Sequence, residues 1–153
     1  MYRKILIPLD GSDLAQCALE HAKEIAKGCS VPVIELATVV KTFFWWEGEV
    51  TDPRIYEQVE TEEKEKAQDY LNKQKQQLAQ AGFSVNTILL EGNAAQAIID
   101  YAEKNGVDLI LMTTHGRSGI TRFALGSVTD KVVRTVSVPV LVIAPPGCRV
   151  PAA

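Results

Sequence analysis

Five short apolar segments alternate along this chain with longer segments of helical periodicity. The apolar segments span residues 4–9, 32–40, 84–90, 109–113 and 138–144. They are rich in Val, Ile and Leu, and most of them lack a strict alternation of polar and apolar positions. Because a strand inside a parallel sheet is covered on both faces, this pattern predicts five buried parallel strands.

Amphipathic helices are predicted in the four gaps between these strands. They span residues 14–27, 53–81, 94–104 and 128–136. The third helix is expected to have Asn93 as its N-cap and the fourth Ser127, with Gln96 and Asp130 three residues further on, as in a capping box. Strands that alternate with helices predict an α/β fold with a single open, mainly parallel five-stranded sheet and helices on both faces.

The length of 153 residues suits one domain, which we expect over residues 1–145, followed by a flexible Pro-rich tail over 146–153. One segment, residues 41–52, departs from the alternation. It holds four consecutive aromatic residues, Phe43 to Trp46, ahead of two glutamates. Such a segment could cover the sheet edge or the long helix as a structural cap. The alternative is that it acts as a lid or as a surface for a partner.

Charge and hydropathy exclude several classes of partner. The net charge of −3 gives no electrostatic case for nucleic acid. No apolar run approaches the roughly 20 residues of a membrane span. The apolar run near the N-terminus is too short for a signal peptide and no small-residue cleavage site follows it. We therefore expect a cytoplasmic protein that binds neither nucleic acid nor membrane.

Ligands of open α/β sheets bind beyond the carboxyl ends of the strands, where the strand order reverses. Asp10 follows the first strand, a Gly-rich stretch follows the fourth, and Gly126-Ser127 precedes the last helix. A helix N-terminus with a glycine and hydroxyls nearby favours a phosphate, although the same residues also fit an ordinary N-cap and loop. The chain has no P-loop, no G-x-G-x-x-G after the first strand and no G-x-S-x-G.

The stretch Thr113-Thr114-His115-Gly116, followed after nine residues by Gly126-Ser127, resembles the glycine motif of the universal stress protein family, G-x-x-G, nine residues, G-[ST]. Residues 4–12 and 138–142 also look like this family, so the resemblance covers nearly the whole chain. It implies a Rossmann-like fold of the adenine nucleotide alpha hydrolase type. It also implies binding of ATP, or of ADP or AMP, with Mg²⁺, and a homodimer formed through the final strand, Val138 to Ala144.

The ATP-binding branch of the family implies a role for each matching residue. By this resemblance Asp10 reaches the ribose or a Mg²⁺ ion on the phosphates. The adenine lies against Pro8, Val39 and Met112. The ribose and phosphates are lined by the backbone of Thr113, Gly116 and Arg117, and the phosphate chain is held by Gly126, Ser127, Val128 and Thr129.

Thr113 stands where the family motif has its first glycine. A β-branched residue does not easily take a positive φ, and its side chain occupies space that a glycine leaves open. If the glycine serves close approach, Thr113 narrows the pocket. If the backbone merely donates a hydrogen bond, the replacement is harmless.

The residues favour a binding protein over a committed enzyme. A hydrolase needs a positioned base near the terminal phosphate, and the candidates Asp10 and His115 have no evident partner in the sequence. We expect a nucleotide-responsive stress module with at most slow ATP hydrolysis. The alternatives are a dimeric scaffold that binds no nucleotide, a flavin electron carrier, and a response-regulator receiver. The receiver fits worst, because it requires an acidic pair after the first strand and a lysine after the fifth.

Overall fold

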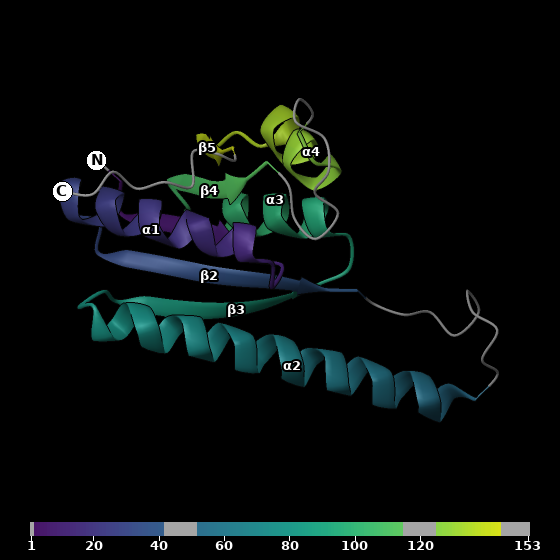
Figure 1. Ribbon diagram of the computed structural model, residues 1–153. Helices are drawn as coiled ribbons and strands as arrows, with labels where there is room; N and C mark the ends of the chain where they lie inside the picture. Colours follow the sequence, from purple (N-terminus) through teal and green to yellow (C-terminus); the bar gives the residue numbers. More distant parts are fainter. Residues whose placement is uncertain (1, 42–51, 115–124, 145–153) are drawn as a thin grey trace.

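All five predicted strands and all four predicted helices form in the computed structural model, which describes residues 2–41, 52–114 and 125–144 (Figure 1). In chain order they are β1 (Lys4–Pro8), α1 (Asp13–Gly28), β2 (Val33–Val40), α2 (Pro53–Gln80), β3 (Val85–Glu91), α3 (Ala94–Lys104), β4 (Leu109–Thr113), α4 (Ser127–Thr135) and β5 (Val140–Ile143). The predicted boundaries differ from these by no more than two residues. Phe43 to Trp46, Gly116, Arg117 and the tail 146–153 lie outside the described residues.

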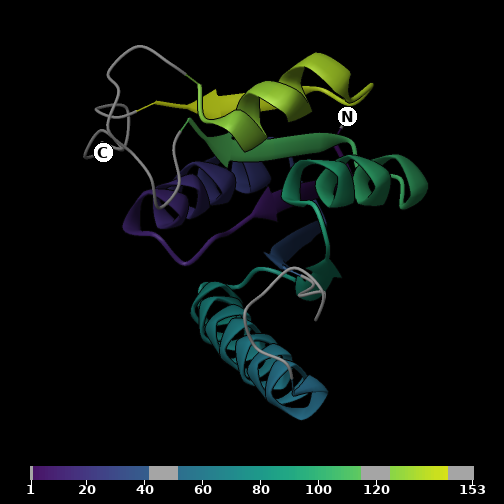
Figure 2. The same ribbon diagram turned by 90° about the vertical axis from the view of Figure 1, so that its right-hand side faces the viewer.

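The strands form one parallel sheet in the order β3-β2-β1-β4-β5, which confirms the predicted fold class. Helices α1 and α2 cover one face, and α3 and α4 cover the other (Figure 2). The chain leaves β1 toward β2 on one side and leaves β4 toward β5 on the other. The strand order therefore reverses between the paired strands β1 and β4, and a crevice is expected at their carboxyl ends.

Two hydrophobic clusters, one on each face, hold the helices to the sheet. Consecutive residues of β1 alternate between them: Ile5 and Ile7 belong to the cluster under α1 and α2, and Leu6 belongs to the cluster under α3 and α4. All three side chains are fully buried. Burial of one such side chain stabilises the fold by about 1.5–3 kcal/mol. This two-sided burial is why the strands read as continuous apolar runs in the sequence.

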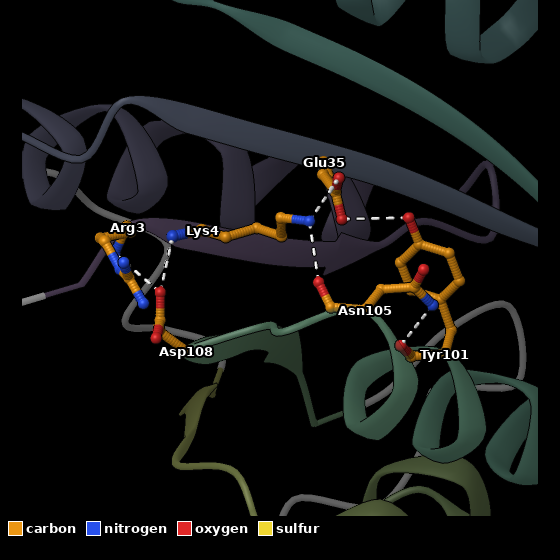
Figure 3. A network of polar contacts seen from close by, with 6 residues as sticks. All are labelled: Arg3, Lys4, Glu35, Tyr101, Asn105 and Asp108. Atoms are coloured by element: carbon orange, nitrogen blue, oxygen red, sulfur yellow. Dashed lines mark hydrogen bonds and ion pairs between the residues drawn. The ribbon is translucent and has the colours of Figure 1, made fainter.

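A buried carboxylate ties α3 to the two central strands. Glu35 of β2 is 4% exposed and lies 3.3 Å from the Lys4 Nζ of β1 (Figure 3). The Tyr101 hydroxyl of α3 donates to the same carboxylate at 3.1 Å, and Lys4 Nζ donates to the Asn105 carbonyl at 2.9 Å. Burial and the neighbouring Glu35 charge raise the pKa of Tyr101 to about 12. Because the charge is both paired and hydrogen-bonded, its burial is tolerated and fixes α3 against the sheet.

A second carboxylate holds the start of β1 in place. Asp108 Oδ2, just before β4, accepts the backbone N–H groups of Arg3 at 2.8 Å and Lys4 at 2.9 Å (Figure 3). The hydrogen bond from the Arg3 backbone is the main reason that the pKa of Asp108 lies below its usual value. The beginning of β1 is therefore anchored to the segment that leads into β4, at the edge of the sheet opposite the carboxyl ends of these strands.

Candidate functional site

A cavity of about 380 Å³ opens at the carboxyl ends of β1, β2 and β4, where the strand order reverses. Nine of the eleven predicted site residues line it. They are Pro8, Asp10, Val39, Met112, Thr113, Gly126, Ser127, Val128 and Thr129. The other two, Gly116 and Arg117, lie outside the described residues. Residues more than a hundred positions apart in the sequence thus meet at the crevice that the sheet topology creates.

Asp10 is oriented by the turn that leads into α1. Its Oδ1 accepts the Ser12 backbone N–H at 3.0 Å and the Ser12 hydroxyl at 2.6 Å. Ser12 is in turn the N-cap of α1, and its Oγ accepts the Ala15 N–H at 3.1 Å. The carboxylate is therefore held at the cavity by a local network and does not depend on a ligand for its position.

The N-terminus of α4 forms another wall of the cavity. Gly126, not Ser127, is its N-cap, so the predicted capping box at Ser127 is wrong. Gly126 has extended backbone angles, φ −59° and ψ 151°, and its carbonyl accepts the Asp130 N–H at 2.8 Å, while Ser127 is already helical. Since glycine has no side chain, no side-chain oxygen caps this helix. The N–H groups of its first turn lack intrahelical acceptors and carry the positive end of the helix dipole.

Thr129 is buried, and its hydroxyl donates to the Thr113 carbonyl at 2.9 Å. The Gly126 N–H donates to the Thr114 carbonyl at 2.6 Å. These two bonds fix the start of α4 against the end of β4. Because the hydroxyl proton of Thr129 is used inside the protein, the groups that this helix end offers to a ligand are the backbone N–H of Thr129 and the hydroxyl of Ser127, which is exposed.

Thr113 ends β4, pairs in register with Ile143 of β5 and lines the cavity. Ser30 is the one non-glycine residue with a positive φ in the described part of the chain. The backbone at Thr113 therefore has an ordinary conformation, and nothing in it requires a glycine. Both readings of this replacement remain: either the threonine side chain narrows the pocket, or the replacement is harmless.

Several lining residues were missed by sequence reasoning: Leu9, Ala15, Ala37, Lys41, Ala94, Ile98 and Thr114. Lys41 differs from the others because it is charged. It directly follows the last residue of β2, and strand alternation continued by one residue would put it on the same face as Val39, two residues earlier. That signal was present in the sequence, but it required knowing that β2 continues past the end of β1.

The comparison with known proteins agrees with the fold. The model of the universal stress protein family matches residues 1–144. The chain belongs to the universal stress protein family. A curated member, universal stress protein MJ0531 from Methanocaldococcus jannaschii, is 38% identical over 147 residues, which cover 95% of this chain and 84% of that protein.

Solved members of the universal stress protein family share the whole architecture. The structure of MJ0577 from the same archaeon superposes with a TM-score of 0.82 at 32% identity and covers 99% of both chains. A universal stress protein solved in complex with cAMP superposes with a TM-score of 0.64 at 23% identity, over 94% of this chain and 97% of that one. The second likeness is evidence for the fold alone.

No group of three or more His, Cys, Asp or Glu side chains among the described residues is arranged to hold a metal ion. Asp10 still fits a Mg²⁺ ion that is shared with phosphates, because Mg²⁺ typically takes one or two carboxylates along with phosphate oxygens and water. Within the same residues, no helix has the length and apolar character needed to cross a bilayer.

Proposed function

We propose that this universal stress protein binds ATP, or ADP or AMP in its place, in the cavity between β1 and β4. The observation that carries the proposal is the N-terminus of α4, which opens onto a mainly apolar cavity without a side-chain cap. Backbone N–H groups and the helix dipole favour a phosphate, and the apolar wall of Ala37, Val39 and Met112 suits a purine ring. The neighbour crystallised with cAMP is an example of this fold holding an adenine nucleotide.

The role that we propose is a nucleotide-responsive module of the stress response in the cytoplasm, with no committed enzymatic activity. Asp10 would hold Mg²⁺ on the phosphates or reach the ribose. As Oδ1 of Asp10 already accepts two hydrogen bonds from Ser12, the carboxylate is better suited to orienting a ligand or ion than to taking a proton from water. We expect at most slow ATP hydrolysis.

We further propose that the protein works as a homodimer through the C-terminal strand. β5 is an edge strand, and Leu141 in it is 41% exposed. The strand itself, Val140–Ile143, is wholly apolar and carries no charge that would block pairing with another chain. An uncovered apolar edge of this kind favours association, and two identical edges pair with two-fold symmetry.

Titration calorimetry of the purified protein with Mg-ATP tests the nucleotide proposal. We expect saturable binding of one nucleotide per chain, and mass spectrometry of the ligand released from the purified protein identifies the nucleotide that it carries. A protein that gives no binding heat and releases no nucleotide is a scaffold of the same fold, and the proposal is then wrong.

We predict that Thr113→Gly tightens ATP binding, because the branched side chain lines the cavity where the family motif has a glycine. The gain is expected even though glycine destabilises a strand end by roughly 0.5–1 kcal/mol. Calorimetry gives the affinity, and thermal unfolding of the ligand-free protein gives the stability cost separately. Unchanged or weaker binding by Thr113→Gly means that the threonine does not restrict the pocket.

A further inference from the structure

The cavity has two chemically different ends. On the side of β4 lies the N-terminus of α4, with the N–H groups of its first turn. On the side of β2 lie Val39, Lys41 and the first residue of α3, Ala94. Pro8, the last residue of β1, pairs in register with Ala37 of β2, so Lys41 lies four residues further along and beyond the end of β1. Lys41 is therefore at the rim, on the side of the cavity away from α4.

Lys41 is the one cationic residue among the described residues that line the cavity, and Asp10 is the one anionic residue. Lys41 is exposed and forms no ion pair with the part of the chain that the structure describes. It lines the cavity together with Val39, which packs against the cluster under α3 and α4. Its ammonium group is thus available to a ligand that fills the apolar end of the cavity.

Lysine can recognise an edge of a purine base only where that edge carries hydrogen-bond acceptors. On the proposed function, on which this step rests, the phosphates would lie at α4 and the base against Ala37, Val39 and Ile98, at the end of the cavity that Lys41 also lines. An ammonium group has three donors and no acceptor. Adenine presents a donor amine beside its N7, whereas a 6-oxopurine presents two acceptors, O6 and N7, to which lysine binds.

We propose that Lys41 extends the base specificity of the site to 6-oxopurine nucleotides, those of hypoxanthine and guanine. With adenine, the ammonium group has only N7 as an acceptor on this edge, so its contribution is small. With a 6-oxopurine it gains O6 as well. The residue thus sets which purines the site accepts, and the phosphate end remains the same for all of them.

Inosine triphosphate is the most discriminating ligand for this test. Its base, hypoxanthine, has an oxygen in place of the adenine amine and no further substituent. We expect the wild type to bind Mg-ITP with a Kd similar to that for Mg-ATP. Lys41→Met keeps an unbranched side chain only one atom shorter and removes the hydrogen-bond donors. In this variant the Kd for ITP should rise about tenfold more than the Kd for ATP, as for the loss of one good base contact.

Lys73→Met is the matched control, because Lys73 is exposed on α2, which covers the other face of the sheet. It should leave the ratio of the two Kd values at its wild-type level. A Lys41→Met variant that weakens ATP and ITP equally, or neither, overturns the inference. So does a wild type that binds ATP and rejects ITP. If the wild type binds no nucleotide, the proposed function is wrong, and so is the inference that rests on it.

Discussion

Gly126→Val should weaken nucleotide binding strongly while leaving the protein folded. Gly126 precedes α4 with φ −59° and ψ 151°, angles that valine adopts without strain, so the backbone tolerates the change. The branched side chain would occupy the space beside the first turn of α4, where we place the phosphates. Overpacking of this kind costs about 1–3 kcal/mol, which raises the Kd by about 5- to 150-fold. Calorimetry with Mg-ATP gives the Kd, and circular dichroism verifies the fold.

Ser127→Ala is the milder comparison at the same helix end. It removes one hydroxyl and adds no volume, and the expected loss of affinity is about 1 kcal/mol or somewhat more, as for one hydrogen bond to a charged group. Two graded losses, a large one at Gly126 and a small one at Ser127, would support the phosphate position. Wild-type affinity in a folded Gly126→Val protein would place the ligand elsewhere.

The sheet and most of the cavity were predictable from the sequence because they depend on local patterns. Runs such as Ile5 to Ile7 are apolar at every position, and the structure buries them on both faces. The Asn93 cap was also correct, since its Oδ1 accepts the Gln96 N–H at 3.2 Å. The reciprocal half of that capping box is absent, because the Gln96 amide donates to Asp100 at 2.8 Å instead.

Two features of the site were predicted wrongly or missed: the N-cap of α4, which depends on a single residue, and the place of Lys41 at the cavity, which depends on the register between strands. Gly126 and Ser127 are both acceptable N-caps, and the sequence alone favours the serine. The structure selects Gly126, whose N–H is held by the Thr114 carbonyl, so that Ser127 falls one step inside the helix. Lys41 was missed because its place at the cavity depends on how far β2 extends beyond β1, and that is a property of the pairing between strands.

The backbone of β5 determines which of its residues are free to pair with a second chain. The Ile110 N–H donates to the Pro139 carbonyl, and the Thr114 N–H donates to the Ile143 carbonyl, so these two carbonyls face β4. The polar groups of a strand point to alternate sides along the chain, and those of Val140 and Val142 therefore point to the outer edge of the sheet. These two valines carry the backbone groups that a partner strand would use.

Val142→Pro should convert the proposed homodimer into a monomer. Proline removes the outward N–H at the centre of the edge and leaves the inward bonds between β5 and β4 in place. Sedimentation equilibrium at micromolar concentration should show the wild type as a dimer and the variant as a monomer, with circular dichroism confirming that the variant is folded. Leu141→Pro is the matched control. Its N–H faces β4, so this change should lower the melting temperature of the protein instead of acting on association alone. A monomeric wild type would refute the dimer, and a folded Val142→Pro that remains fully dimeric would move the interface to another surface.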